Sequence, residues 1–312
     1  MQKCVYYPEG FLIGTEENAE LTASAEGLAR AMQTGRIVEG RALVCDERHN
    51  LIVSLGDRRG IIPREEAAVG ISEGKTKDIA IISRVGKPVC FRVMSLCDAE
   101  PDGVVAVLSR RAAQQECEDY LLSTLVPGDI LPGRVTHLEP FGSFVDIGCG
   151  VVSLISIDNI SVSRISHPRD RFYPGQNIRA VVREIDRENR RITLTHKELL
   201  GTWSQNAELF AAGQTVAGIV RTVEDYGVFV ELTPNLAGLA EPREGIRPGQ
   251  RAAVYIKSIL PEKMKVKLAI IDVFDDDESE RPRHDYFVEG EHIDRWEYSP
   301  PGCEKRIETV FS

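Results

Sequence analysis

Short runs of alternating apolar and polar residues recur along most of this chain. Clear examples are FGSFVDIG at 141–148, YGVFVEL at 226–232 and MKVKL at 264–268. β-branched and aromatic residues dominate these runs, and Gly, Pro or Asp separates them, as expected for short β-strands joined by tight turns. Alternation with a period of two gives each strand one buried and one outward face. The pattern therefore predicts a mainly β protein.

The runs belong to an internal repeat. PGDILPGRVTHLEPFGSFVDI (127–147) aligns without a gap to AGQTVAGIVRTVEDYGVFVEL (212–232) at an offset of 85 residues. YPGQNIRAVVREI (173–185) aligns to RPGQRAAVYIKSI (247–259) at an offset of 74, so the later copy is shorter between these strands by 11 residues. A fainter first copy begins at TGRIVEGRALV (34–44). Three copies of several short strands predict three small closed barrels.

The predicted fold is mainly β, with three tandem five-stranded OB-fold barrels joined by short helices. An N-terminal helix is expected to start at a cap on Thr15, and apolar residues at helical spacing from Leu199 to Phe210 predict one linker helix. The expected organisation is a helical segment (1–32), a degenerate barrel (33–113), a linker helix (114–125), a second barrel (126–197), a linker helix (198–212), a third barrel (213–272) and an acidic, aromatic tail (273–312).

Two aromatic residues are predicted to stand outside each of the later barrels. In FGSFVDIG, Val145 and Ile147 suit the core, which leaves Phe144 on the outer face beside Asp146. The third copy repeats this arrangement with Phe229 beside Glu231, and a glycine bend is expected to bring Phe141 and Tyr226 to the same surface. Exposed rings on an OB barrel are typical of stacking surfaces for unpaired bases. The alternative is that they cover the barrel edge or pack on the following helix.

Composition narrows the class of protein. The formal net charge is −10, yet the three barrel regions sum to +2, +2 and +1, and the connectors and tail hold the negative charge. The first thirty residues lack a signal-peptide pattern and no apolar run is long enough to span a membrane, which predicts a cytoplasmic protein. Seven cysteines without a C-x-x-C pair are expected to be reduced, buried thiols.

No nucleotide-binding, serine-hydrolase or zinc-protease motif occurs, so we expect no enzyme, no cofactor and no metal. In the tail, His284, His292 and Cys303 have no common zinc spacing, and the acidic run 275–280 is typical of a solvated linker. The tail is also rich in aromatic residues between Tyr286 and Phe311. They either form short strands that dock on a barrel or contact a partner.

The segments FGSFVDIG and YGVFVEL, each followed by PGQ and a basic last strand, resemble the repeat domain of the bacterial ribosomal protein S1 family. The resemblance covers about 230 residues and is strongest in the second copy. In that family the RNA surface consists of two aromatics in the F-G-x-F segment, a histidine on the next strand, and an acidic and a basic residue around the final turn. In the second copy these positions are Phe141, Phe144, Ser156, Asp186 and Arg191. Ser156 replaces the histidine, which removes one stacking or donor group.

In the third copy the resemblance assigns Tyr226, Phe229 and Lys265 to RNA binding, and Glu241 takes the histidine position, where a carboxylate is expected to repel phosphate. In the first copy His49 and Ile52 occupy the aromatic positions, so the aromatic surface is absent and the barrel is interpreted as a protein-docking or structural module. Five cations are expected to contact phosphate, with ordinary solvated strand residues as the alternative: Arg190, Arg191, Lys263, Lys265 and Lys267.

Three functional hypotheses follow. The first is a translation factor whose second and third barrels bind single-stranded mRNA while residues 33–113 attach to the small ribosomal subunit. The second is an RNA-binding regulator of RNA decay or transcription, and the third is a scaffold of protein-binding barrels. A monomer without membrane contact is expected in each case.

Overall fold

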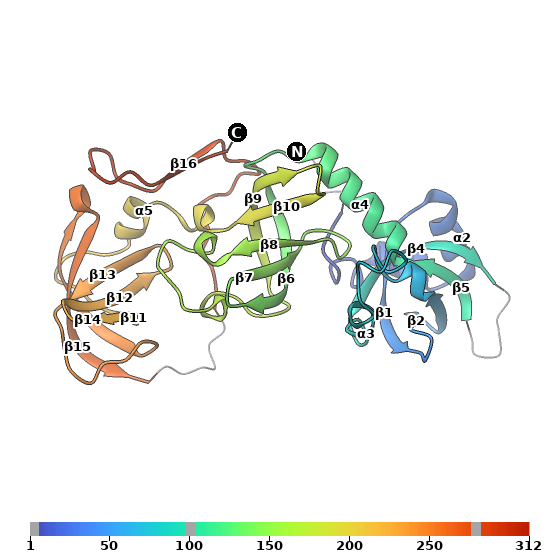
Figure 1. The fold of residues 1–312 in the computed structure, drawn as a ribbon, viewed down its shortest axis with the longest axis horizontal. Helices are drawn as coiled ribbons and strands as arrows, with labels where there is room; N and C mark the ends of the chain where they lie inside the picture. The colour runs from blue at the N-terminus through green and yellow to red at the C-terminus, as the bar shows by residue number, and fades with distance from the viewer. Residues whose placement is uncertain (1–5, 98–103, 276–281, 312) are drawn as a thin grey trace. The chain divides into compact units, whose positions relative to one another are not determined.

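The computed structural model describes residues 6–97, 104–275 and 282–311. Its strands close into three five-stranded barrels (Figure 1), which confirms the predicted fold class. The chain groups into two compact units. The first comprises Met1–Leu125, Pro132–Arg134 and Asp146–Val152, and the second comprises Val126–Leu131, Val135–Val145 and Ser153–Ser312. None of the helices in the described ranges is long and apolar enough to cross a membrane.

The three barrels share one topology. The first has the strand order β1-β2-β3-β5-β4, the third has β11-β12-β13-β15-β14, and the second has the same order when read as β6-β7-β8-β10-β9. One pair in each barrel is parallel, namely β3 with β5, β8 with β10, and β13 with β15. Because every strand has two partners, the barrels leave no unpaired sheet edge.

The strand bounds follow the predicted repeat. The first barrel consists of β1 (Val38–Cys45), β2 (Leu51–Leu55), β3 (Arg58–Ile62), β4 (Pro88–Leu96) and β5 (Val104–Ser109). The second consists of β6 (Ile130–Glu139), β7 (Gly142–Asp146), β8 (Val152–Ser156), β9 (Asn177–Asp186) and β10 (Arg191–Thr195). The third consists of β11 (Thr215–Glu224), β12 (Gly227–Thr233), β13 (Leu236–Ala240), β14 (Arg251–Leu260) and β15 (Lys265–Phe274).

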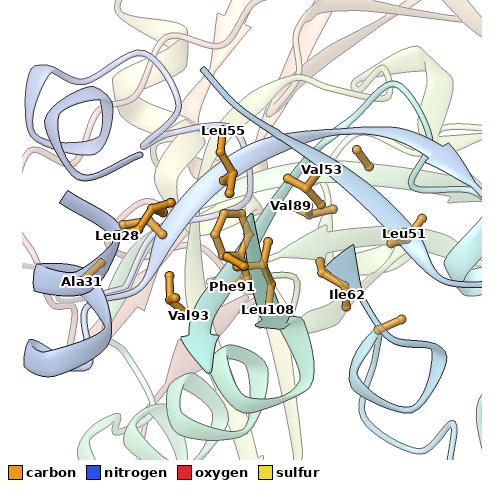
Figure 2. Packing of buried hydrophobic residues seen from close by; sticks show 14 of the residues in the cluster. Leu28, Ala31, Leu51, Val53, Leu55, Ile62, Val89, Phe91, Val93 and Leu108 are labelled. Atoms are coloured by element: carbon orange, nitrogen blue, oxygen red, sulfur yellow. The ribbon is translucent and has the colours of Figure 1, made fainter. Parts of the chain in front are cut away.

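Each barrel buries the apolar side of its alternating strands. In the first barrel, Val53, Phe91 and Leu108 meet inside the sheet, and Leu28 joins them from a helix at the N-terminal side (Figure 2). Phe91 is fully buried. Burying a side chain of this size contributes roughly 1.5–3 kcal/mol. The cores therefore hold the barrels closed and fix which side chains face outward.

The helices differ from the predicted pattern in two places. The N-terminal helix is divided into α1 (Glu16–Thr22) and α2 (Ala25–Thr34), because Ser24 acts as a second N-cap and accepts a hydrogen bond from Gly27 N at 3.0 Å. The predicted cap at Thr15 is present and accepts from Asn18 N.

The second linker is also broken. It consists of the 3-10 turn η4 (Lys197–Leu200) and the short helix α5 (Trp203–Ala207), separated by Gly201, whose positive φ of +83° favours glycine. The first linker is one helix, α4 (Arg110–Thr124), which begins before the predicted range of 114–125. Four shorter elements lie in connections: η1 (Arg64–Glu66), α3 (Ile79–Ile82), η2 (Ile157–Asn159) and η3 (Pro168–Asp170). A further 3-10 turn, η5 (Pro261–Lys263), joins β14 to β15.

The C-terminal tail folds onto the second unit. β16 (Arg295–Glu297) pairs with β17 (Glu308–Val310), and Trp296 and Tyr298 are buried in the core of the third barrel. The structure thus shows the first of the two alternatives, short strands docked on a barrel. Residues 276–280 of the acidic run lie outside the described residues.

The six cysteines within the described residues are free thiols but are not all buried. Cys90, Cys117 and Cys149 are buried, whereas Cys97 is exposed and Cys45 and Cys303 are half-buried. The prediction of uniform burial is therefore wrong for Cys97, which lies just past β4. Cys4 lies outside the described residues.

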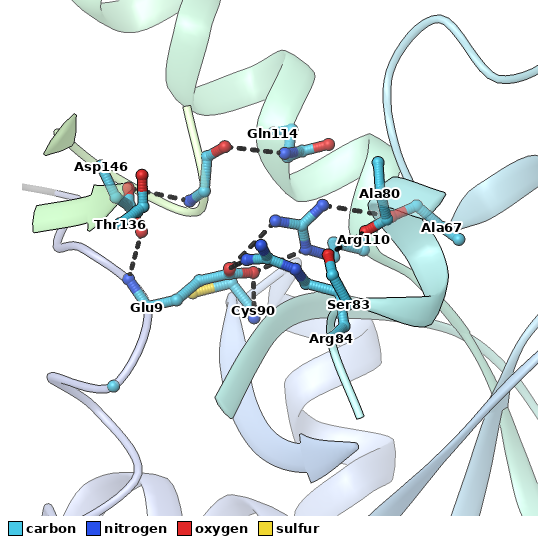
Figure 3. Close-up of polar contacts among 12 residues, drawn as sticks. Glu9, Ala67, Ala80, Ser83, Arg84, Cys90, Arg110, Gln114, Thr136 and Asp146 are labelled. Atoms are coloured by element: carbon cyan, nitrogen blue, oxygen red, sulfur yellow. Dashed lines mark hydrogen bonds and ion pairs between the residues drawn. The ribbon is translucent and has the colours of Figure 1, made fainter. Parts of the chain in front are cut away.

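A buried ionic cluster stabilises the first unit (Figure 3). The Glu9 side chain is 5 % exposed, and it pairs with Arg110 at 2.6 Å and with Arg84 at 3.3 Å. Glu9 also accepts from Cys90 N at 3.1 Å, and its own backbone N–H donates to Asp146 at 2.8 Å. Burial alone would raise the pKa of Glu9, but the two guanidinium groups hold it below its usual range. The N-terminal segment is thus tied to the barrel by charge.

We predict that Glu9→Ala strongly destabilises the first unit, by roughly 3–5 kcal/mol, because it leaves Arg110 buried without its carboxylate. The matched control is Glu17→Ala, which removes an exposed ion pair with Arg36 and should change little. Hydrogen–deuterium exchange of the β1–β5 amides measures both. Equal protection in the two variants would contradict the structural role of Glu9.

Candidate nucleic-acid interface

The alternation of β7 places Phe144 on the outer face of the second barrel. Val145 and Ile147 are 0 % and 1 % exposed, whereas Phe144 is half-buried. β12 repeats the arrangement, with Val228 and Val230 buried. The predicted faces of these aromatic strands are therefore present in both barrels, and Phe229 is half-buried like Phe144.

Glycine is needed next to each ring for a reason other than bending. A Cβ on Gly142 would lie 2.4 Å from the carbonyl oxygen of Ile155, and one on Gly227 would lie 2.6 Å from that of Ala240. The neighbouring strand therefore approaches so closely that no larger residue fits. This close approach holds the start of β7 and β12, where the first aromatic of each pair is attached.

The two carboxylates beside the rings are not on the surface, which corrects the sequence prediction. Asp146 is 2 % exposed and accepts from Gly148 N at 2.9 Å and Gly150 N at 3.0 Å. Burial, reinforced by the charge of Glu9, raises the pKa of Asp146 to about 7. Glu231 is 5 % exposed and pairs with two arginines, Arg171 and Arg221. Each carboxylate also has one partner that is remote in sequence, the backbone N–H of Glu9 for Asp146 and Arg171 for Glu231.

The rings form one edge-to-face pair in the second barrel and one in the third. The centroids of Phe141 and Phe144 are 6.0 Å apart with an interplanar angle of 89°, and those of Tyr226 and Phe229 are 6.1 Å apart at 87°. Phe141 is 55 % exposed and Tyr226 is 66 % exposed. A large apolar ring that faces solvent gains no stabilisation from burial, so each pair is a candidate contact surface. We call the two pairs the aromatic platforms.

The structure adds His137 to the platform of the second barrel. The sequence did not predict this residue. Its ring lies 6.2 Å from that of Phe144 at an interplanar angle of 30°, and its side chain is 62 % exposed. His137 Nε2 contacts Glu139 at 2.6 Å. Thr222 is the equivalent residue in the third barrel, where it pairs with Phe229 across β11 and β12. Only the strand register shows that this position faces the ring.

Ser156, which replaces the expected histidine, lies at the end of β8 and accepts a hydrogen bond from Asn159 at 2.7 Å. Asp186 and Arg191 are paired residues at the tip of the β9–β10 hairpin. Hydrogen bonds from Asn189 hold the pKa of Asp186 below its usual range. Arg190 forms the exposed turn between the strands, with φ +53°.

Strand register relates the cations to the platforms. In the third barrel one row of outward residues crosses four strands: Thr222, Phe229, Leu239 and Lys267. The equivalent row of the second barrel is His137, Phe144, Leu154 and Thr193. Lys267 therefore belongs to the platform row, and Lys265 and Arg191 each lie one outward position along their strand. Lys263 lies beyond them, in η5.

Glu241 does not act as an isolated negative charge. Its carboxylate pairs with Lys257 Nζ at 2.7 Å, and this contact holds the pKa of Glu241 below its usual range. Both groups are exposed, so the pair is weak. The expected repulsion of phosphate is reduced by the neighbouring ammonium group.

The first barrel carries an aliphatic row in the same place. Its outward residues are Val44, Ile52, Ile61 and Val107. Val44 is 52 % exposed, and Leu43 and Met94 nearby on β1 and β4 are also exposed. His49 is in the turn before β2 with φ +63°. The row offers neither an aromatic ring nor a cation.

The tail residues considered as metal ligands, His284, His292 and Cys303, do not form a cluster. His284 is half-buried against Phe172 and His196, with ring centroids at 5.3 and 4.8 Å, and its partial burial lowers the pKa of His284 to about 4. His292 contacts Asp129 at 2.7 Å. Within the described ranges, no three His, Cys, Asp or Glu side chains gather in a metal-binding group.

Comparison with known proteins places the strongest likeness on the second barrel. Residues 125–197 match the S1 RNA binding domain. The small ribosomal subunit protein bS1 of Staphylococcus aureus (strain COL) is 29 % identical over 277 residues, covering 84 % of this chain and 68 % of that protein. The bS1 protein of Leuconostoc lactis is 30 % identical over 243 residues, covering 72 % and 53 %.

Among solved structures, the chain is similar to a multidomain protein with nucleic acid binding domains from Streptococcus pneumoniae TIGR4. The two are 18 % identical, with coverage of 76 % of this chain and 73 % of that chain and a TM-score of 0.25. The sequence comparisons show that the chain resembles bS1 over most of its length and that its second barrel is an S1 domain.

Proposed function

We propose that this relative of ribosomal protein bS1 binds single-stranded RNA, including mRNA, through the aromatic platforms of its second and third barrels. The observation that carries the proposal is the pair of solvent-facing rings, Phe141 with Phe144, on a barrel that matches the S1 RNA binding domain. Stacking on such rings stabilises binding by roughly 1–3 kcal/mol per base and accepts every base. We therefore expect little sequence preference.

The surrounding charges fit a modest, salt-sensitive contact with the RNA backbone. Arg190 and Arg191 lie at the β9–β10 turn. Lys265 and Lys267 lie on β15, and Lys263 lies in the turn before it. All five are exposed. Each phosphate that they neutralise should add a log–log salt slope of roughly −0.7 on a single strand.

The second and third barrels are joined by contacts that suit binding of one strand across both. Arg171 of the second barrel pairs with Glu231 of the third at 2.5 Å, and Val162 N donates to Asn235 Oδ1 at 2.9 Å. Arg171 and Glu231 are both buried, which makes this joint costly to open. The tail adds Trp296 to the core of the third barrel.

The first barrel has a different role in this proposal. Its aliphatic row supports a contact with protein rather than with nucleic acid, and the matched relatives are small ribosomal subunit proteins. We therefore place attachment to the small ribosomal subunit on residues 33–113, and a cytoplasmic role in translation follows. The chain would act by binding and not as an enzyme.

The same RNA surface would serve a regulator of RNA decay or transcription, and the aliphatic row alone would suit a protein scaffold. Cosedimentation of the full chain with small ribosomal subunits separates the translation role from a role in decay. Binding of single-stranded RNA separates both from the scaffold.

Phe144→Ala should weaken binding of an unstructured RNA to the full chain by roughly 1–3 kcal/mol, the loss of one stacked base, with little change in thermal stability. The matched control is Val145→Ala, whose buried methyl groups should cost roughly 1–3 kcal/mol of unfolding free energy while RNA affinity is kept. Fluorescence anisotropy and thermal unfolding measure the two effects. If the effects are exchanged between the neighbours, the face assignment and the proposal both fail.

His137→Ala should weaken RNA binding by about 1 kcal/mol, because it removes a ring stacked beside Phe144. Thr222→Ala, the equivalent change in the third barrel, should have little effect. In a Phe144→Ala background, Thr222→His should recover part of the lost affinity by adding a ring next to Phe229. Anisotropy titrations with the same RNA decide, and equal affinities of His137→Ala and the unmodified chain would remove His137 from the platform.

A further inference from the structure

A cavity of about 440 Å³ lies in the second unit, between the end of β8 and the loop that follows η2. Ile157, Asp158, Ser163, Arg164 and Lys197 line it, and Ile307 of the tail closes one side. Its volume is within the range of roughly 300–1,000 Å³ that is typical of sites for small ligands. The loop belongs to the segment that is 11 residues longer here than in the third barrel.

The cavity lining is hydrogen-bonded to the backbone that carries the aromatic platform of the second barrel. Ile157 N donates to the carbonyl oxygen of Phe141 at 2.9 Å, so the backbone that carries the exposed ring is bonded to the cavity lining. A second connection runs from Ser156 through Asn159, which donates to Ser156 at 2.7 Å and accepts from Lys197 at 3.2 Å. A strand of RNA stacked on Phe141 therefore has the cavity next to it.

The charges of the cavity suit a phosphate. Arg164 is exposed and has no hydrogen-bond or ion-pair partner anywhere in residues 6–97, 104–275 and 282–311. Lys197 Nζ donates to two neutral oxygens, Asp158 O at 3.4 Å and Asn159 Oδ1 at 3.2 Å. Two cations thus face one lining carboxylate, that of Asp158, and an arginine fork binds phosphate oxygens well.

The remaining lining suits the rest of a nucleotide. Ile157, Val162 and Ile307 are half-buried and give apolar walls against which a base can lie. Asp158 is exposed at the rim. A carboxylate accepts hydrogen bonds, and the ribose 2′-hydroxyl and the amino groups of bases are donors. DNA lacks the first of these donors.

We propose that this cavity is a nucleotide site that holds the residue of single-stranded RNA next to the one stacked on Phe141, with Arg164 and Lys197 on its phosphates. The site rests on the proposed RNA-binding function and extends it. The segment of the third barrel at 241–250 lacks the extra residues that build the cavity. The second barrel therefore occupies a longer stretch of RNA than the third.

The test uses the full chain and two single-stranded RNAs, one of ~4 nucleotides that covers a platform and one of ~12 nucleotides that extends past it. Arg164→Ala should weaken binding of the longer RNA by roughly fivefold or more, as expected for a lost charge-assisted contact. It should also make its salt slope shallower by about 0.7. Affinity for the shorter RNA should fall by a smaller factor, because it can stack on the rings without entering the cavity. Arg169→Ala is the matched control, because Arg169 is exposed in the same loop and does not line the cavity.

The outcomes are distinct. If both RNAs bind the unmodified chain and Arg164→Ala leaves the affinity and salt slope of the longer RNA unchanged, the nucleotide site is wrong while RNA binding stands. An equal loss of affinity in Arg169→Ala likewise overturns the site, because removing any positive charge from this loop would then weaken RNA binding to the same extent. If neither RNA binds the unmodified chain, the proposed function itself fails.

Discussion

Closure of the five-stranded barrel is the constraint from which the rest of this structure follows. A closed barrel pairs every strand on both sides, so the alternate side chains that do not enter the core form fixed rows across its outer surface. In the second and third barrels these rows present Phe144 and Phe229, supported by Val145 and Val230 beneath them. In the first barrel the same row presents Ile52 between Val44 and Ile61. One framework thus offers two kinds of surface without any change in strand order.

The closed barrels and their outward rings could be predicted because they depend on local alternation. Phe144 next to Val145 requires only that a strand has two faces, and the repeat shows the same pair again at Phe229 and Val230. The carboxylates could not be placed in this way. Asp146 is buried by the backbone of Glu9, 137 residues away, and Glu231 by Arg171, 60 residues away. Contacts of that range are invisible to a pattern of period two.

Other parts of the site could not be predicted without the strand register and the loop geometry. His137 meets Phe144 only because β6 and β7 are aligned so that these side chains face each other, and no spacing in the sequence fixes that alignment. The second linker is broken at Gly201, whose positive φ ends the helix that the apolar residues from Leu199 to Phe210 predicted. The cavity arises where η2 and the loop that follows it meet Lys197 and, from the tail, Ile307, which lie far from that loop along the chain.

The proposed function assigns base binding to the ring-bearing rows and protein binding to the aliphatic row. Ultraviolet crosslinking of a uridine-rich single strand to the full chain, followed by mass spectrometry of the crosslinked peptides, tests it most directly. The account predicts crosslinks in the peptides that carry Phe141 with Phe144 and Tyr226 with Phe229. Crosslinks confined to residues 33–113, or none on either aromatic platform, would contradict it.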